Sequence, residues 1–377
     1  MRGAVKRRFN ECLFMNLHIA PDNTFTNKFY ANLQELKLAD NNRVVIRSGE
    51  NKLRSVTHDL PFAPLYSSRF DALVGKTRDY EKVFIHYFTP LMYRWVAKND
   101  FRELNWMVWG GDLYNLPGLD KYCYEPLTFE RYVRRNRSFK GRLYDLKIRL
   151  TQSRFSKDAY SKINNILTWM TEEYNFAREH LPVKAQHKFF FYENQVPYHQ
   201  LDSVAQPSHN LDRKVLIVGN SGSPTNNHLD AIQFLESTGV EGDLIIPVSY
   251  GDPHYISFLK KEIKFSFGEV KFLERYMPFD EYLRLMASSD GLIMNSLRPQ
   301  GYGNILMMMY LEKPVYLNRK NTSLPDLDRA GLKWRSIDTI TSLRSTDKIQ
   351  NKEAVTAFLS HDRLTREYRQ LFDFVKF

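Results

Sequence analysis

Two polar residues in the first half of the chain stand where proton transfer is often carried out. His86 ends the apolar run Lys-Val-Phe-Ile-His, and Asp112 follows Trp109 and a pair of glycines. We expect both at strand ends, where an imidazole or a carboxylate can take a proton from an attacking hydroxyl. Each also has a structural interpretation. His86 fits a hydrogen-bonded histidine at a strand end, and Asp112 fits a turn or N-cap residue.

Small polar residues follow an apolar run at four places in the second half of the chain. Such loops offer backbone N–H groups, amides and arginines, the groups that bind phosphate and ribose. One loop of this kind is typical of an ordinary turn, but four at the same edge of a sheet favour a shared ligand site. The four loops are 219–223, 249–252, 295–304 and 318–321.

These loops supply the candidate residues of a phosphate or nucleotide site. The fingerprint G-x-G-x-x-G and the Walker sequence are both absent, which disfavours a dinucleotide dehydrogenase and a P-loop ATPase. The pair Asp326 and Asp328 lies away from the loops, so we expect a site that works without a metal or other cofactor. The candidates are Gly219, Asn220, Ser221, Asn226, Tyr250, Asn295, Arg298, Gln300, Gly301, Gly303, Asn304, Asn318 and Arg319.

Strands and helices alternate along the chain and would position these loops. This rhythm predicts an α/β fold with doubly wound parallel sheets, which bind ligands at the carboxyl ends of their strands. In the first half we expect strands at 13–19, 43–46, 82–86, 106–109, 150–154 and 188–191, and helices at 27–36, 91–98, 159–167 and 171–179. In the second half we expect strands at 215–218, 243–248, 271–273, 291–294 and 314–317, and helices at 226–235, 253–264, 279–287 and 304–312.

The length of 377 residues is sufficient for two domains, each with its own core. The polar stretch 199–212 contains a proline and is the expected linker. We therefore predict an N-terminal domain over residues 1–205 and a C-terminal domain over residues 206–377, with the last helix packing back on the N-terminal domain.

The net charge of +11 indicates an anionic partner, which nucleic acid, an acidic membrane or a pyrophosphate-bearing substrate would each provide. Arginines and aromatic residues alternate between Arg131 and Arg142. This segment fits a solvated helix face or a contact with an anionic membrane surface. No nucleic-acid-binding motif is present, so no nucleic acid is expected. Two cysteines without a CxxC spacing, and no apolar run of membrane-spanning length, favour a cytoplasmic protein, soluble or peripherally attached.

Longer motifs, taken in order, resemble one enzyme family, the TDP-N-acetylfucosamine:lipid II N-acetylfucosaminyltransferases (4-alpha-L-fucosyltransferases, glycosyltransferase family 56). The resemblance covers roughly residues 80 to 325. Its motifs are Trp106-x-x-Trp-Gly-x-Asp-Leu-Tyr114, the Val-Gly-Asn-Ser-Gly run to Asn226-x-His228, Pro247-x-x-Tyr-Gly251, Phe279-Asp-x-Tyr282-Leu, Gln300-Gly-x-Gly303, Pro314 and Asn318-Arg319.

The resemblance implies a GT-B fold, in which two Rossmann-like domains face each other across a cleft. The C-terminal domain would hold a TDP-linked sugar, and the N-terminal domain an undecaprenyl-pyrophosphate-linked glycan at the inner face of the cell membrane. The family transfers 4-acetamido-4,6-dideoxygalactose during assembly of enterobacterial common antigen. The family's Trp-Gly-Ala-Asp is Trp109-Gly-Gly-Asp112 here, which leaves the sugars open while sugar transfer is expected to hold.

In such an enzyme, protein groups must stabilise the leaving diphosphate. We assign this role to backbone N–H groups in 219–223 and 301–304, with Arg298 or Arg319 as the cation. Asp112 is the first candidate for the general base of an inverting reaction and His86 the second, while Asn220, Asn226 and Gln300 would position the donor. The alternatives are a non-catalytic nucleotide-sugar or polyanion-binding protein and, from charge alone, a nucleic-acid-binding protein.

Overall fold

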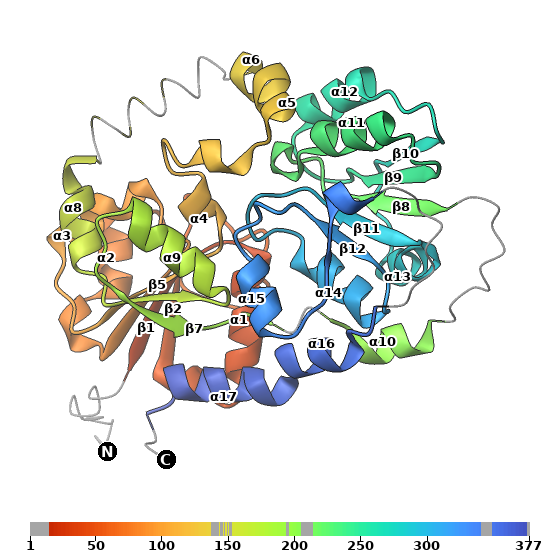
Figure 1. Ribbon diagram of the computed structural model, residues 1–377. Coiled ribbons are helices and arrows are strands. Elements are labelled where there is room, and N and C mark those ends of the chain that lie inside the picture. Colours follow the sequence, from red (N-terminus) through yellow and green to blue (C-terminus); the bar gives the residue numbers. More distant parts are fainter. Residues whose placement is uncertain are drawn as a thin grey trace, which may run out of the picture. The chain divides into compact units, whose positions relative to one another are not determined.

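The computed structural model describes residues 15–136, 143, 146, 148, 150, 153–193, 196–204, 214–340 and 349–374. The chain forms two compact units that alternate along the sequence (Figure 1). Unit 1 comprises Met1–Leu116, Leu143–Glu193 and His361–Phe377, and unit 2 comprises Pro117–Arg142 and Asn194–Ser360. The domain boundary at residue 205 stays a prediction.

Unit 1 is built on a parallel sheet of seven strands in the order β3-β2-β1-β4-β5-β6-β7. The central strands are buried along their whole length, as expected where helices cover both faces. The strands are β1 (Asn16–Pro21), β2 (Asn42–Arg47), β3 (Phe62–Ala63), β4 (Lys82–His86), β5 (Leu104–Met107), β6 (Asn165–Thr168) and β7 (Gln186–Phe189). The α-helices used below are α1 (Thr24–Glu35), α2 (Ser68–Val74), α3 (Tyr93–Lys98), α4 (Gly111–Tyr114), α8 (Ser156–Ser161), α9 (Thr171–His180) and α17 (His361–Phe372).

Unit 2 contains a parallel sheet of six strands in the order β10-β9-β8-β11-β12-β13. The strand order reverses between β8 and β11, which is where ligands bind in open α/β sheets. The strands are β8 (Val215–Val218), β9 (Asp243–Pro247), β10 (Val270–Leu273), β11 (Gly291–Met294), β12 (Val315–Leu317) and β13 (Arg335–Ser336). The helices are α5 (Pro126–Thr128), α6 (Arg134–Asn136), α10 (Tyr198–Ser203), α11 (His228–Thr238), α12 (Pro253–Glu262), α13 (Phe279–Ser288), α14 (Tyr302–Tyr310), α15 (Leu324–Arg329) and α16 (Lys352–Phe358).

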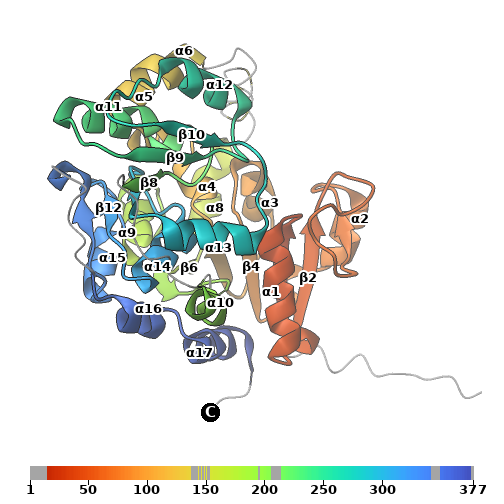
Figure 2. The same ribbon diagram turned by 90° about the vertical axis from the view of Figure 1, so that its right-hand side faces the viewer.

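The core of unit 2 forms where the apolar face of α11 packs on the sheet. Ala231, Ile232 and Leu235 of this helix contact residues of β8 and β9. Helices α5 and α6 lie beside α11 and α12 in both views (Figures 1 and 2). Helix α14 is buried along nearly its whole length, so packing against the core fixes its position.

The last helix completes the aromatic core of unit 1. The ring of Phe372 on α17 is fully buried and lies 5.1 Å from Phe84, 5.2 Å from His18 and 5.4 Å from Phe29, measured between ring centroids. Its carbonyl also accepts a 3.0 Å hydrogen bond from Nδ2 of Asn42 on β2. Unit 1 therefore depends on residues from both ends of the chain.

Several predicted elements differ from the structure. A strand at 150–154 is wrong, because Ser153–Phe155 forms a 3-10 helix. The helix predicted at 159–167 is also wrong, since α8 ends at Ser161 and β6 begins at Asn165. The expected linker begins with α10, and residues 205–213 lie outside the described residues. All five strands predicted in the second half are confirmed.

Within the described ranges, no helix combines the length and the apolar character that crossing a membrane requires.

We expect Phe372→Ala to lower the free energy of unfolding of unit 1 by about 3–5 kcal/mol, because it leaves a cavity among packed rings. Four of the five tryptophans, Trp95, Trp106, Trp109 and Trp169, belong to unit 1. Tryptophan fluorescence during urea denaturation therefore reports mainly on this unit. The control is Leu91→Ala, at a side chain that is 42% exposed. A loss at Phe372 no larger than in the control would contradict this account of the core.

Candidate active site

The loop after β8 is closed by a glycine that no other residue can replace without strain. Gly219 has a φ of +74°, and a Cβ at this position would lie 2.3 Å from Nε2 of His228 at the start of α11. Burial lowers the pKa of His228 to about 3, so a neutral imidazole fills the space beneath the loop. The backbone therefore turns tightly over the first turn of α11.

Asn226 holds this loop from within. Its Nδ2 donates hydrogen bonds to the carbonyl and the hydroxyl of Ser221, at 2.9 and 3.1 Å, and its Oδ1 accepts one from the N–H of Asn220 at 3.3 Å. Asn226 and Ser221 are both buried. Asn226 and Ser221, both predicted to bind the donor, therefore make their hydrogen bonds within the loop itself.

A chain of side-chain hydrogen bonds joins the loops that follow β8, β9 and β11. Asn220 donates to the hydroxyl of Tyr250 at 3.1 Å and accepts from Nε2 of Gln300 at 3.2 Å. The hydroxyl of Thr225 donates to Oε1 of Gln300 at 2.6 Å. Three of the four predicted loops therefore meet at Asn220, and Asn220, Tyr250 and Gln300 are all at least partly exposed.

Two glycines allow the backbones of the first two loops to touch. The N–H of Gly222 donates to the carbonyl of Tyr250 at 2.7 Å, and the N–H of Asp252 donates to the carbonyl of Gly222 at 2.9 Å. Gly251 has a φ of +130°, and a Cβ here would lie 2.4 Å from the carbonyl carbon of Gly222. Side chains at either position would separate the loops.

The start of α14 offers backbone N–H groups at the same edge of the sheet. Gly301, its N-cap, has a φ of +65°, and no side chain caps the helix. The first turn contains no acidic residue, so the positive end of the helix dipole is not neutralised locally. Gly301, Gly303 and Asn304 are partly exposed, and Nδ2 of Asn304 donates to the hydroxyl of Tyr282 at 2.7 Å.

Asn295 and Asn318 belong to a second network that ties the loops to the segment before α5. Nδ2 of Asn318 donates to Oδ1 of Asn295 at 2.7 Å and to Oε1 of Glu125 at 3.0 Å. Asn227, with a φ of +51°, exchanges amide-to-carbonyl hydrogen bonds with Asn295. Glu125 and Asn227 were not predicted, although asparagine is one of the few non-glycine residues enriched in the left-handed region and Asn227 follows directly on Asn226.

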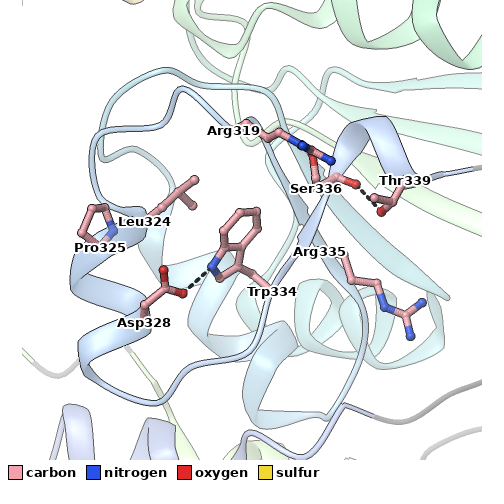
Figure 3. Close-up of a pocket in the computed structure, with 8 residues that line it drawn as sticks. All are labelled: Arg319, Leu324, Pro325, Asp328, Trp334, Arg335, Ser336 and Thr339. Atoms are coloured by element: carbon pink, nitrogen blue, oxygen red, sulfur yellow. Dashed lines mark hydrogen bonds between the residues drawn. The ribbon is translucent and has the colours of Figure 1, made fainter.

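The two candidate cations have different surroundings. Arg298 is partly buried and donates to the carbonyl of Pro299 at 3.2 Å. Arg319 forms an ion pair with Asp338 at 3.0 Å and donates to the hydroxyl of Ser336 at 2.8 Å. Arg319 and Trp334 are among the residues that line a pocket of about 600 Å³. In Figure 3 the guanidinium of Arg319 lies beside Ser336. The charge of Arg319 is thus balanced by Asp338.

The predicted site residues of unit 1 are buried beneath the carboxyl edge of its sheet. The carboxylate of Asp112 accepts three hydrogen bonds: at Oδ2 from the indole of Trp106 (2.6 Å) and the N–H of Phe88 (2.9 Å), and at Oδ1 from the N–H of Trp109 (2.9 Å). Asp112 is only 2% exposed, and burial raises its pKa to about 6 despite these donors. The contacts assign Asp112 a positioning role, joining the loops after β4 and β5.

Tyr87, directly after His86, has a left-handed backbone. Its φ of +60° costs a bulky residue about 1–2 kcal/mol, and hydrogen bonds to charged groups hold it on both sides. Nη2 of Arg47 donates to its carbonyl at 2.7 Å, and the next N–H, that of Phe88, donates to Asp112. Burial lowers the pKa of Arg47 to about 10, so the guanidinium remains charged. We name Arg47, Asp112 and the peptide between Tyr87 and Phe88 the Tyr87 clamp.

His86 lies in a chain of buried hydrogen bonds whose direction is fixed. Nδ2 of Asn42 donates to two carbonyls, so its Oδ1 accepts from Nε2 of His18 at 3.0 Å. Burial lowers the pKa of His18 to about 3 and that of His86 well below its ordinary value, so both rings are neutral. His86 must then donate through Nε2 to Nδ1 of His18 at 3.0 Å.

The same chain continues to the edge of the sheet. Nδ1 of His86 accepts from the hydroxyl of Tyr192 at 2.8 Å, and that oxygen accepts from the indole N–H of Trp109 at 2.5 Å. Both nitrogens of His86 are therefore occupied, which assigns it a positioning role as well. The catalytic roles of Asp112 and His86 stay predictions. Arg47, His18 and Tyr192 were missed, although Arg47 ends a strand and Tyr192 follows one.

In the described part of the basic segment, Tyr132 packs within unit 2, whereas Arg131, Arg134 and Arg135 are exposed to solvent. The hydroxyl of Tyr132 donates to Asp252 at 2.5 Å, and its ring packs on Tyr255. Arg131 pairs with Glu262 at 3.5 Å, and Arg134 pairs with Glu130 at 2.7 Å. The rest of the segment, including Arg137, Phe139, Lys140, Arg142 and Tyr144, lies outside the described residues.

Among the residues that the structure describes, no group of three or more His, Cys, Asp or Glu side chains is placed to hold a metal ion. Metal independence stays a prediction.

Comparison with protein families matches this chain to a family of glycosyltransferases. The family model described as 4-alpha-L-fucosyltransferase, glycosyl transferase group 56, matches residues 72–357, which is more than half of the chain. This span includes the Tyr87 clamp apart from Arg47, and all the loops of unit 2 described above.

Comparison with solved structures confirms the fold. A glycosyltransferase from Rickettsia africae ESF-5 has a TM-score of 0.57 at 12% identity, covering 95% of this chain and 97% of that chain. Anabaena HepE in complex with UDP has a TM-score of 0.54 at 12% identity, covering 96% and 100%. Sucrose-phosphate synthase from Thermosynechococcus elongatus has a TM-score of 0.51 at 12% identity, covering 95% and 99%. The predicted GT-B fold, with two Rossmann-like domains, is confirmed.

We expect the burial of Asp112 to appear in the pH dependence of stability. Because its pKa is raised from 3.8 to about 6, the folded chain holds a proton here more tightly than the unfolded chain. Between these two pH values, the contribution of Asp112 to the free energy of unfolding therefore falls as pH rises. We therefore expect the difference in free energy of unfolding between the wild type and Asp112→Asn to become smaller as pH rises through this range. Urea denaturation at several pH values measures this difference.

The Asn variant should also be less stable throughout, by about 1–3 kcal/mol, because its amide N–H₂ would face N–H donors. Asp59→Asn, at an exposed carboxylate, is the control. A difference between wild type and Asp112→Asn that does not change with pH would contradict the raised pKa.

Proposed function

We propose that this chain, which belongs to the 4-alpha-L-fucosyltransferase family (glycosyl transferase group 56), transfers an N-acetylfucosamine-like deoxy-amino sugar from a TDP-linked donor to a lipid-pyrophosphate-linked saccharide. The chain is a glycosyltransferase with a GT-B fold. The observation that carries the proposal is the family match over residues 72–357 together with the joined loops at the switch point of unit 2.

We place the donor diphosphate at the loop after β8 and the start of α14. The N–H groups of Gly219, Asn220 and Gly222 already donate within the protein, so we assign the diphosphate to other N–H groups of this loop and of the start of α14. Preorganised donors of this kind typically lower a barrier by about 3–4 kcal/mol each. Arg298 or Arg319 is the cation we assign to the diphosphate, since both follow strands at this edge of the sheet. The Anabaena HepE structures hold UDP and UDP-glucose, which supports a nucleotide-sugar donor.

We place the base of the nucleotide against exposed aromatic side chains at the same edge. Tyr250 is 62% exposed and Tyr276 is 85% exposed. Pro247 pairs with Leu273 where β9 and β10 end, so each tyrosine lies three residues beyond the same register position. Two exposed rings beside a phosphate-binding loop suit a planar base, which stacks on aromatic faces.

The acceptor is proposed to be an undecaprenyl-pyrophosphate-linked glycan used in bacterial surface polysaccharide assembly, such as that of enterobacterial common antigen. A lipid acceptor implies work at the inner face of the cell membrane. The net charge of +11 favours association with an anionic surface. Peripheral attachment is part of this proposal.

Thermal unfolding in the presence of TDP, UDP, GDP and CMP tests the donor class. A ligand at a hundred times its Kd stabilises the folded state by about 2.7 kcal/mol, so we expect TDP to raise the Tm more than the other three nucleotides. Mass spectrometry of a lipid-linked acceptor, incubated with a TDP-linked 4-acetamido-4,6-dideoxyhexose, should then show one added sugar. No rise in Tm with any nucleotide would overturn the donor assignment.

Gly301→Ala should abolish most of the nucleotide-induced rise in Tm. The added Cβ would lie 2.6 Å from Cε of Met294 and 3.0 Å from Cγ of Asn220, which displaces the loop that carries the N–H groups. Gly331→Ala is the matched control, because Gly331 has a φ of +71° but nothing within 4 Å of the new Cβ. Equal nucleotide responses in the two variants would argue against a donor site at α14.

A further inference from the structure

Four aromatic rings gather at the carboxyl edge of the sheet in unit 1. Phe25 follows β1, Tyr87 follows β4, Trp109 follows β5 and Tyr192 follows β7. The centroid of Trp109 lies 5.3 Å from that of Phe25, 5.4 Å from that of Tyr87 and 5.7 Å from that of Tyr192. Trp109 is therefore the centre of the group, at the edge where open α/β sheets bind ligands.

These rings differ from the aromatic core beneath them in their exposure. Phe29 and Phe84 are fully buried, whereas Phe25 is 37% exposed and Tyr87, Trp109 and Tyr192 are partly exposed. Clustered apolar rings that face water are a feature of binding sites in soluble proteins.

Two buried devices fix the orientation of the group. The Tyr87 clamp holds the left-handed backbone of Tyr87, and the hydrogen-bond chain through His86 and Tyr192 holds the indole of Trp109. Backbone strain maintained by charged partners is characteristic of functional sites. Rings that do not reorganise on binding make a better surface for a ligand.

We propose that Phe25, Tyr87 and Trp109 form a platform on which a sugar ring of the acceptor packs. The C–H groups on the apolar face of a pyranose carry a small positive charge, and the negative face of an aromatic ring attracts them. The indole N–H of Trp109 is taken by Tyr192, so we expect Trp109 to contact a ligand through its partly exposed ring rather than through a hydrogen bond. This assignment rests on the proposed function, because it is that function which makes the acceptor a saccharide.

Phe25 provides a selective way to disturb the platform. Its ring is 37% exposed and contacts two rings of the group, those of Trp109 and Tyr192. Phe25→Ala removes this ring and leaves the Tyr87 clamp in place. We expect the variant to raise the KM for the acceptor, with the Tm and the donor KM close to those of the wild type.

Trp109→Ala removes the central ring and should raise the acceptor KM by about tenfold or more. Tyr66→Ala is the matched control. Tyr66 is also a left-handed tyrosine of unit 1, with a φ of +70°, and is 46% exposed, but it lies beside α2 and donates to the carbonyl of Leu91. The assay uses an acceptor disaccharide on a short alkyl pyrophosphate, and each variant is also checked for its Tm rise with TDP.

A second readout does not require turnover. Binding of the soluble acceptor should change the tryptophan emission of the wild type and of Trp334→Phe, but not that of Trp109→Phe. Lengthening the alkyl chain should leave the ratio of variant to wild-type acceptor KM unchanged. A ratio that grows with chain length would instead identify the rings as a lipid contact and overturn the platform.

The outcomes separate this inference from the proposed function. If the wild type transfers sugar but Phe25→Ala and Trp109→Ala keep the wild-type acceptor KM, the platform is wrong and the function stands. If no lipid-linked acceptor is glycosylated, the proposed function fails. The platform is then judged by the fluorescence response to soluble N-acetylhexosamine glycosides, and the absence of any response at Trp109 would reject it.

Discussion

The carboxylate of Asp112 holds together the two loops on which the carboxyl edge of unit 1 depends. A carboxylate that is 2% exposed is costly to bury, and its raised pKa reflects that cost. Three N–H donors and the nearby charge of Arg47 offset it. Removing Asp112 would leave those donors unpaired and free the strained peptide at Tyr87. The cost of burying the charge of Asp112 is therefore tied to keeping the left-handed backbone of Tyr87 at this edge.

The loops of unit 2 reach a comparable rigidity through glycines rather than through a buried carboxylate. Gly219, Gly251 and Gly301 all have left-handed backbones, and at each a Cβ would collide with a neighbouring loop or helix. Loops packed this closely leave little freedom to the N–H groups that line them. The two units thus illustrate different solutions to one problem. In unit 1 a side chain bridges loops that lie apart. In unit 2 glycines, which have no side chain, let the loops touch.

The sequence was most informative where chemistry is local. Valine and isoleucine runs predicted the strands of the second half, and loop composition located Asn220, Gln300 and Gly301. The strand Asn165–Thr168 was missed because its four residues begin and end with buried polar side chains, which hides the apolar pattern. Arg47 and Tyr192 were missed for another reason. Their contacts with Tyr87 and His86 join residues 40 and 106 positions apart, and no local pattern records such pairings.

The hydrogen-bond chain through His86 is better suited to orient rings than to move protons. Its outer end is the indole N–H of Trp109, which can donate but has no lone pair in the ring plane to accept a proton. Its inner histidine is neutral because burial lowers its pKa to about 3, so a proton delivered to His18 would not remain there at neutral pH. Both nitrogens of His86 and both oxygens of Asp112 make hydrogen bonds within unit 1, and these bonds hold the loops and rings at this edge in place.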